Sequence, residues 1–259
     1  MNRFRQKFNE KKQLFVPFFT LGDPGFDRSF EIIKTAIDAG ADALELGFAF
    51  SDPIADGPLN QRSMMRALHA GMNFDKAILL LKRIRQAYPD LPIGLLLYYN
   101  LIYRQGEAAY QKLASADVDA VVCADLPLEE ADKHLQFLEK YNVGSVQMVA
   151  PNSPDQRVGA LFAHSSAYAY VLSGFGTTGV KETVSVETIH RIKHVKALGD
   201  TPIIVGFGIS KPEHVKAVFD AGADGAIVGS YFTSLIENNL DDIKQVKREI
   251  ADFIHRVKQ

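Results

Sequence analysis

The chain has 259 residues, 47% hydrophobic and 23% charged, and its 29 Lys and Arg residues nearly balance 31 Asp and Glu residues to give a net charge of −2. This balance argues against a nucleic-acid-binding protein, which usually carries a basic excess on one face. The single cysteine, Cys123, excludes an internal disulfide and a cysteine-based metal centre. No apolar run has the length of a membrane span or the pattern of a signal peptide, so we expect a cytoplasmic enzyme.

The chain alternates between short apolar runs and longer amphipathic stretches. Residues 3–12 predict a short amphipathic helix whose basic side chains lie in solvent. Later stretches with apolar residues three and four apart, such as Phe30, Ile33 and Ile37, predict further helices. Eight apolar or β-branched runs predict strands: Leu14–Phe19, Ala43–Gly47, Pro92–Tyr98, Ala120–Ala124, Val146–Val149, Ala167–Leu172, Pro202–Val205 and Gly225–Val228.

The order of these elements predicts one α/β domain over residues 1–259, a single (β/α)₈ TIM barrel with an extra N-terminal helix. Strands that alternate with helices are usually parallel, because parallel neighbours need a crossover connection. Eight repeats favour a closed barrel, which typically takes ~250 residues. Residues 38–47 and 220–229 resemble each other, as expected for repeated units, although a shared turn chemistry explains the likeness equally well.

Glycine-rich loops follow the seventh and eighth predicted strands. The first spans residues 206–210, and the second begins at Gly229 and Ser230, where a helix is expected to start. Glycines allow close approach of the backbone, and the free N–H groups at a helix start favour an anion. The pair of loops predicts a phosphate site at the barrel mouth. The alternative is that the glycines only make tight turns.

Carboxylates are expected at the same end of the barrel. Strand alternation directs Glu45 inward, where loss of solvent raises the pKa of a carboxyl group and suits it to acid–base catalysis. The alternative is an ion pair with a core Lys or Arg, but the predicted strands contain neither. Asp52 is interpreted as a structural turn residue. Asp56 is placed to reach over the mouth, and spacing alone leaves a catalytic role open.

Further groups are expected near the mouth. Asp125 follows the fourth strand, and Tyr98 and Tyr170 lie near the ends of the third and sixth, where filling of the core is the commoner role for tyrosine. Residues 173–179 have the small side chains of a mobile lid. His190 and His194 share a helical spacing, but the basic residues around them favour a solvated helix over a metal site. No metal is predicted.

Several motifs in this order resemble the tryptophan synthase alpha chain family. They are Phe15-Val-Pro-Phe-Phe-Thr-Leu-Gly-Asp-Pro24, Leu44-Glu-Leu-Gly47, Phe50-Ser-Asp-Pro-Ile-Ala-Asp-Gly-Pro58, Ala124-Asp-Leu-Pro-Leu-Glu-Glu130 and Gly206-Phe-Gly-Ile-Ser210. The likeness runs from about residue 4 to the final helix. It implies the retro-aldol cleavage of indole-3-glycerol phosphate to indole and glyceraldehyde 3-phosphate, without a metal or an organic cofactor.

The resemblance also assigns roles to residues. Glu45 and Asp56 match the family's two catalytic carboxylates, and Thr178 matches a residue that hydrogen-bonds to Asp56. The other substrate-binding positions implied are Phe18, Leu96, Tyr98, Asp125, Tyr170 and Phe207. The phosphate-binding positions implied are Gly179, Gly208, Gly229 and Ser230.

The resemblance implies a partner as well, a pyridoxal-phosphate β subunit in an αββα complex that receives indole through a tunnel. The chain departs from the family's usual residues at Ala49 (usually Pro), Leu59-Asn60 (usually Thr-Ile), Tyr99 (usually Ala) and Gly174-Phe175 (usually Arg-Ser). We expect the polar Asn60 to weaken packing near the indole. Three alternatives are a lyase that works alone, a non-catalytic phosphate-binding activator of a partner, and a flavin-phosphate or sugar-phosphate barrel.

Overall fold

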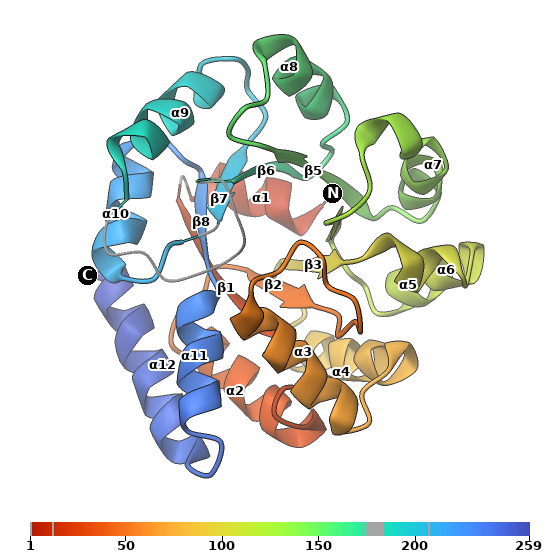
Figure 1. Ribbon diagram of the computed structural model, residues 1–259, viewed down its shortest axis with the longest axis vertical. Helices are drawn as coiled ribbons and strands as arrows, with labels where there is room; N and C mark the ends of the chain where they lie inside the picture. Colours follow the sequence, from red (N-terminus) through yellow and green to blue (C-terminus); the bar gives the residue numbers. More distant parts are fainter. Residues whose placement is uncertain (1, 12, 173, 175–183, 207) are drawn as a thin grey trace.

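Eight parallel strands, hydrogen-bonded in chain order, close into a barrel in which β8 pairs with β1 (Figure 1). The computed structural model describes residues 2–11, 13–172, 174, 184–206 and 208–259. The strands are β1 (Leu14–Thr20), β2 (Leu44–Gly47), β3 (Ile93–Leu97), β4 (Ala120–Cys123), β5 (Gly144–Val149), β6 (Tyr168–Leu172), β7 (Ile203–Gly206) and β8 (Gly225–Val228). The predicted TIM barrel is confirmed, and every strand end lies within two residues of its predicted position.

Helices surround the barrel and connect its strands (Figure 1). The predicted N-terminal helix is confirmed as α1, and some connections contain two helices, such as α3 and α4 between β2 and β3. The helices are α1 (Arg3–Glu10), α2 (Phe26–Asp38), α3 (Pro58–His69), α4 (Phe74–Ala87), α5 (Tyr99–Tyr103), α6 (Glu107–Ser115), η1 (Leu128–Glu130), α7 (Asp132–Lys140), α8 (Asp155–Ala163), α9 (Val186–Lys196), α10 (Pro212–Asp220), α11 (Ser230–Asn238) and α12 (Ile243–Lys258).

The buried side chains form two layers. Residues on the inner faces of the strands, including Val16, Val122 and Ile204, fill the barrel. Their neighbours along each strand, such as Leu44 and Leu46, pack between the strands and the helices. This alternation follows from the two-residue period of a strand, and it directs the even-numbered leucines of β2 away from the barrel and the residue between them into it.

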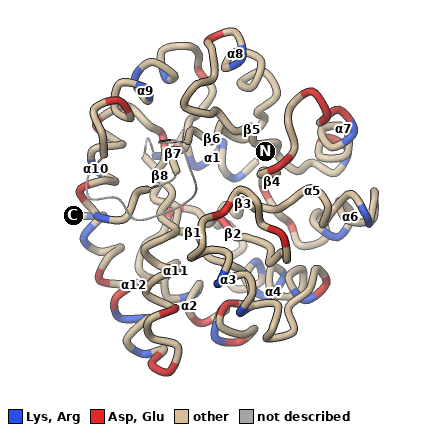
Figure 2. Tube along the Cα trace, in the orientation of Figure 1, with Lys and Arg blue, Asp and Glu red and all other residues tan. Residues whose placement is uncertain are grey.

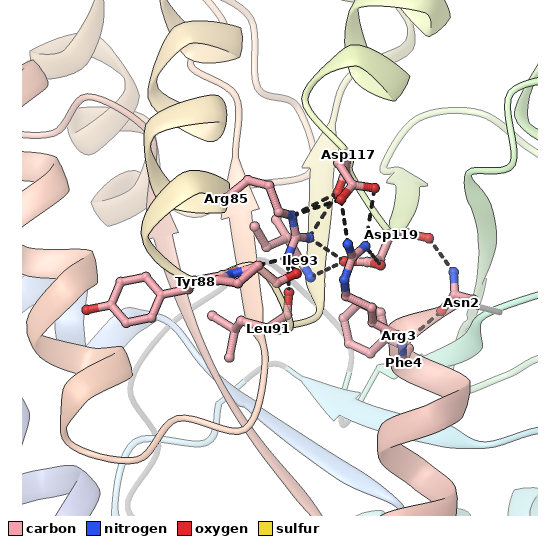
Figure 3. A network of polar contacts seen from close by, with 10 residues as sticks. Asn2, Arg3, Phe4, Arg85, Tyr88, Leu91, Ile93, Asp117 and Asp119 are labelled. Carbon is pink, nitrogen blue, oxygen red and sulfur yellow. Dashed lines mark hydrogen bonds and ion pairs between the residues drawn. The ribbon is translucent and has the colours of Figure 1, made fainter.

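Helix α1 closes the N-terminal end of the barrel. Phe4 is fully buried, and its ring centroid lies 5.0 Å from that of Tyr168 at the start of β6. The basic face was expected to lie in solvent, but the Arg3 side chain is only 27% exposed and pairs with Asp117 and Asp119 (Figure 3). The helix is therefore fixed to the barrel by both apolar and ionic contacts.

The same end of the barrel contains four related side-chain-to-backbone hydrogen bonds. In each, a residue just before an even-numbered strand accepts the N–H of a residue at the start of the preceding strand. The four bonds join Asp42 to Phe15 (2.7 Å), Asp119 to Ile93 (2.8 Å), Ser166 to Ser145 (2.8 Å) and Asp224 to Ile203 (2.7 Å). Three of the four acceptors are carboxylates that also form ion pairs with basic side chains. These pairs are Asp42 with Lys11 and Lys258, Asp119 with Arg3 and Arg85, and Asp224 with Lys196.

Of the four acceptors, Asp119 belongs to the network of polar contacts drawn in Figure 3. Its Oδ2 accepts from Arg85 Nη2 at 2.7 Å, and its Oδ1 accepts from Arg3 Nη1 at 2.9 Å. Arg85 also donates to the backbone carbonyl oxygens of Asp117 and Leu91. Both Asp119 and Arg85 are buried, so each charge depends on the other for compensation of its lost hydration.

Charged residues of both signs are spread over the outer helices and loops (Figure 2). This distribution agrees with the nearly balanced composition and shows no single basic face among the described residues. None of the helices in the described part of the chain combines the length and the apolar character that a bilayer crossing requires.

The Asp119 contacts predict a large difference between two neighbouring aspartates. Asp119→Ala leaves the buried charge of Arg85 without its buried carboxylate and the N–H of Ile93 without its acceptor. We expect it to lower the free energy of unfolding by about 3–5 kcal/mol. Asp117→Ala removes a carboxylate that pairs with the same two arginines but is 56% exposed, and we expect a loss of about 1 kcal/mol or less. Urea denaturation measures both, and equal losses would contradict the assignment.

Candidate active site

A pocket lies at the C-terminal ends of the strands. Its walls are largely apolar, as is typical of small-molecule sites. It is lined by Phe18, Glu45, Ala55, Asp56, Asn60, Leu96, Ala124, Met148, Tyr170, Gly208, Ile209, Ile227, Gly229 and Ser230. The pocket therefore brings both predicted carboxylates together with most of the predicted binding residues.

Glu45 lies in the middle of β2 and extends into the barrel, as its position in the strand predicts. It is 1% exposed, and its Oε1 has no hydrogen-bond partner. Within the described residues it forms no ion pair, so the alternative of a core salt bridge has no support there. Burial, and secondly the charge of Asp56, raise the pKa of Glu45 to about 8. The carboxyl group is thus largely protonated at neutral pH.

Asp56 lies in the segment between β2 and α3, which folds over the barrel mouth. Asp56 is 5% exposed, and its carboxyl group accepts hydrogen bonds from Tyr98 Oη at 2.7 Å and Asn60 Nδ2 at 2.8 Å. Burial raises the pKa of Asp56, while these two hydrogen bonds oppose that rise because they favour the charged form. Asn60, which was expected to weaken packing around the indole, lines the pocket and is hydrogen-bonded to Asp56.

Tyr98 supports the segment that carries Asp56. It is fully buried, accepts the N–H of Ala55 at 3.0 Å, and stacks against Phe50 with 5.2 Å between ring centroids. The resemblance placed it in the indole pocket, whereas here it lies behind Asp56 and does not line the cavity itself. Its hydroxyl group therefore acts on the site through Asp56.

Tyr170 lies on β6 and reaches the pocket across the end of β7. A Cβ atom on Gly206 would lie 2.0 Å from Tyr170 Oη, far inside van der Waals contact. The absence of a side chain at this position thus permits Tyr170 to adopt its place beside Glu45. Burial and the Glu45 charge raise the pKa of Tyr170 well above its usual value, so the group is a neutral phenol that can donate a hydrogen bond.

The other side of the pocket is formed by the segments that follow β7 and β8. Gly208 has a φ of +74°, a conformation that favours glycine. Gly229 is the N-cap of α11, and Ser230 is its first residue; all three line the pocket. The first N–H groups of a helix have no partner within the helix, so this end of the pocket suits a phosphate.

Two predicted site residues, Tyr98 and Asp125, do not line the described pocket. Asp125 is exposed, and its Oδ1 accepts the N–H of Tyr99 at the start of α5 at 2.7 Å. Thr178, Gly179 and Phe207 lie outside the described residues, as does most of the predicted lid at 173–179. The roles assigned to these residues remain predictions.

Several pocket residues were not identified from the sequence. Ala124, Met148 and Ile227 line the cavity. Met148 and Ile227 lie on the inward faces of β5 and β8, so the alternation that identified Glu45 also contained the signal for them. In the described part of the chain, no group of three or more His, Cys, Asp or Glu residues could hold a metal ion. His194 pairs with Asp155 at 2.7 Å on the outside of the barrel.

Comparison with known proteins gives consistent matches along the chain. A family model described as tryptophan synthase alpha chain matches residues 4–259. The tryptophan synthase alpha chain of Methanothermobacter thermautotrophicus is 47% identical over 245 residues, which cover 94% of this chain and 90% of that relative. That of Histophilus somni is 43% identical over 265 residues, with coverage of 100% and 98%.

Solved structures match the whole barrel. A chain of the tryptophan synthase α2β2 complex from Pyrococcus furiosus superimposes with a TM-score of 0.87 at 31% identity, covering 95% of this chain and 97% of that chain. The tryptophan synthase alpha chain from Legionella pneumophila gives a TM-score of 0.87 at 28% identity, with coverage of 100% and 98%. The sequence comparisons and the structure comparisons therefore find the same family of proteins.

The burial of Glu45 predicts a pH-dependent stability difference. With a pKa near 8 in the folded protein and 4.5 in the unfolded chain, its ionisation opposes folding increasingly from about pH 4.5 to pH 8. Glu45→Gln should therefore stabilise the protein more at pH 8 than at pH 5, as measured by urea denaturation. Glu139→Gln, on an exposed helix position, should change the free energy of unfolding by ~0.5 kcal/mol or less at both pH values. A pH-independent effect of Glu45→Gln would refute the burial argument.

Proposed function

The chain belongs to the tryptophan synthase alpha chain family, and we propose that its pocket cleaves indole-3-glycerol phosphate to indole and glyceraldehyde 3-phosphate. The chain is then a carbon–carbon lyase of tryptophan biosynthesis. One observation carries the assignment of the site: a buried Glu45 with a raised pKa and a hydrogen-bonded Asp56 share a pocket whose other end is a helix N-terminus. An apolar aromatic ring and a phosphate at the two ends of one substrate match this arrangement.

The pocket orients the substrate by its two ends. The phosphate binds at Gly208, Gly229 and Ser230, where the first N–H groups of α11 favour an anion. The indole ring lies among apolar side chains, with Phe18 and Leu96 as two of its walls. The glycerol carbons then lie between the two sites, close to Glu45.

Cleavage begins with a proton transfer to carbon. Glu45 donates its proton to C3 of the indole, which leaves a positive charge shared with the ring nitrogen. The ionised Asp56 accepts a hydrogen bond from the indole N–H and stabilises this charge. The desolvated site strengthens that interaction, because opposite charges attract more strongly where water is excluded.

Bond breaking then uses the same glutamate as a base. The Glu45 carboxylate removes the proton of the hydroxyl group next to C3, and the oxygen electrons form the aldehyde carbonyl. The electrons of the broken C–C bond restore the C2–C3 double bond of indole and neutralise the ring nitrogen. Glu45 ends in its protonated form, so one turnover consumes no external acid or base.

Other residues have supporting roles in the proposal. Tyr170 is placed to donate a hydrogen bond beside Glu45, and Tyr98 holds Asp56. From the family resemblance, Thr178 binds Asp56, Gly179 contributes to the phosphate site, and Phe207 and Asp125 contact substrate. The reaction only rearranges protons and electron pairs within the substrate, so acid–base groups are sufficient for it.

The biological unit in the proposal includes a β subunit. Members of the family act with a pyridoxal-phosphate β subunit in an αββα complex, and the matched Pyrococcus furiosus structure is such an α2β2 complex. Indole is uncharged and would escape across membranes, which gives a physical reason for passing it directly to the partner. We place the complex in the cytoplasm and assign the α reaction to one domain, residues 1–259.

The mechanism predicts large losses from two conservative substitutions. Glu45→Gln and Asp56→Asn should each lower kcat by ~10²–10⁴-fold, because each removes an acid–base or charge-stabilising group. Asp52 is an exposed residue of the same segment and does not line the pocket, so Asp52→Asn should retain the rate. Since the first step needs protonated Glu45, kcat/KM of the native enzyme should fall as pH rises through about 8. Near-normal rates in both catalytic variants would overturn the mechanism.

The partnership predicts activation of indole release. Purified chain is assayed with indole-3-glycerol phosphate, with and without a cognate β subunit. Slow release that rises sharply with the partner supports the complex, whereas fast release that the partner does not change supports a lyase that works alone. Absence of release under both conditions would contradict the proposed reaction and leave only a phosphate-binding barrel.

A further inference from the structure

Asn60 links Asp56 to a helix on the other side of the pocket. It lies in the first turn of α3, is 4% exposed, and donates from Nδ2 to Asp56 Oδ1 at 2.8 Å. Its Oδ1 accepts from Thr233 Oγ1 on α11 at 3.2 Å. A buried line of hydrogen bonds therefore runs from Thr233 through Asn60 to the Asp56 carboxylate.

The chemistry of the three groups fixes the direction of both bonds. An ionised carboxylate can only accept, so the amide nitrogen of Asn60 must face Asp56. The amide oxygen then faces Thr233, whose hydroxyl group must be the donor. Thr233 thus selects the one amide orientation in which Asn60 can donate to Asp56.

Among the described residues, each oxygen of the Asp56 carboxylate accepts from one side-chain donor. Tyr98 binds Oδ2 and Asn60 binds Oδ1, so the plane of the carboxylate is fixed by two side chains from different elements. The other titratable groups that act on Asp56 in the described structure are Glu45 and Tyr170. Among the described residues, Tyr98 and Asn60 are the side chains whose hydrogen bonds orient the carboxylate. Thr178, which the family resemblance assigns to Asp56, lies outside the described residues.

The position of Asn60 has a further consequence for the substrate. Thr233 lies one turn after Gly229 on α11, and its N–H binds the Gly229 carbonyl oxygen at 3.0 Å. Helix α11 therefore contacts the phosphate site at its first residues and orients Asn60 one turn later. The residue usual in the family at this position, isoleucine, could fill the space but could not donate a hydrogen bond.

We propose that Asn60, oriented by Thr233, is a positioning residue that holds the Asp56 carboxylate towards the indole nitrogen. This inference rests on the proposed lyase function and adds a residue to it. Hydrogen bonds to charged groups are stronger than those between neutral groups, so the loss of this donor should affect catalysis and the ionisation of Asp56 together.

The central experiment compares Asn60→Leu with the native enzyme. We expect kcat to fall about 10–100-fold with little change in KM, and the acid limb of the kcat profile to move up by about one pH unit, because the hydrogen bond favours ionised Asp56. Asn60→Asp, which has nearly the same shape but places a second carboxylate beside Asp56, should shift the limb further in the same direction.

Matched variants separate positioning from a loss of stability. Thr233→Val removes the hydroxyl group at constant shape and should lower kcat, whereas Thr233→Ser retains the hydroxyl group and should restore most of the rate. Asn73→Ala removes an asparagine that caps α4 by binding the N–H of Lys76. It should cost about 1 kcal/mol of stability and leave kcat unchanged.

A measurement without substrate distinguishes the two proposals. The Asp56 carboxyl carbon is followed by ¹³C NMR titration of the free protein and assigned with Asp56→Asn. An upward shift of its pKa in Asn60→Leu supports the inference even if the native chain does not cleave the substrate, an outcome that would reject only the lyase function. Unchanged kcat and unchanged Asp56 titration in Asn60→Leu would overturn the inference.

Discussion

The barrel depends on hydrogen-bond acceptors for the buried backbone N–H groups at the starts of its strands. A buried N–H group without a partner costs about as much as a lost hydrogen bond, and the start of each odd-numbered strand presents one. Asp42, Asp119, Ser166 and Asp224 accept these N–H groups. Lys and Arg side chains paired with the three aspartates offset the cost of burying their charge. Some of these side chains come from α1 and α12, so the same contacts attach both helices to the N-terminal end of the barrel.

The opposite end of the barrel is organised differently. Glu45 Oε1 is buried without a partner, which opposes folding when the group ionises. The hydrogen bonds and ion pairs at the N-terminal end stabilise the fold and offset this cost at the end where substrate binding is proposed. The asymmetry also distinguishes two buried carboxyl groups: Asp119 accepts hydrogen bonds from Arg3, Arg85 and the N–H of Ile93, whereas Glu45 Oε1 has no donor within the described part of the chain. Burial and the nearby charge of Asp56 raise the pKa of Glu45, so that it can carry a proton.

Local patterns were sufficient to predict the strands, the barrel and the inward direction of Glu45, because these follow from a two-residue period and from element order. The same period contained Met148 and Ile227, which were overlooked. The contact between Asn60 and Asp56 depends on the path of a loop, and Asn60 meets Thr233 across 173 residues of sequence; neither follows from spacing. Asp125 follows β4 as expected, but its hydrogen bond with the N–H of Tyr99 at the start of α5 joins two separate connections and also does not follow from spacing.

The four backbone-accepting side chains also divide the barrel into quarters. Each bond lies within one pair of consecutive strands, β1 with β2, β3 with β4, β5 with β6, and β7 with β8. A chain cleaved at the exposed turn around Asn142, between α7 and β5, would leave two such bonds in each fragment. The two halves would then retain their own strand-entry contacts, which makes this turn the natural place to reassemble the enzyme from separately expressed fragments.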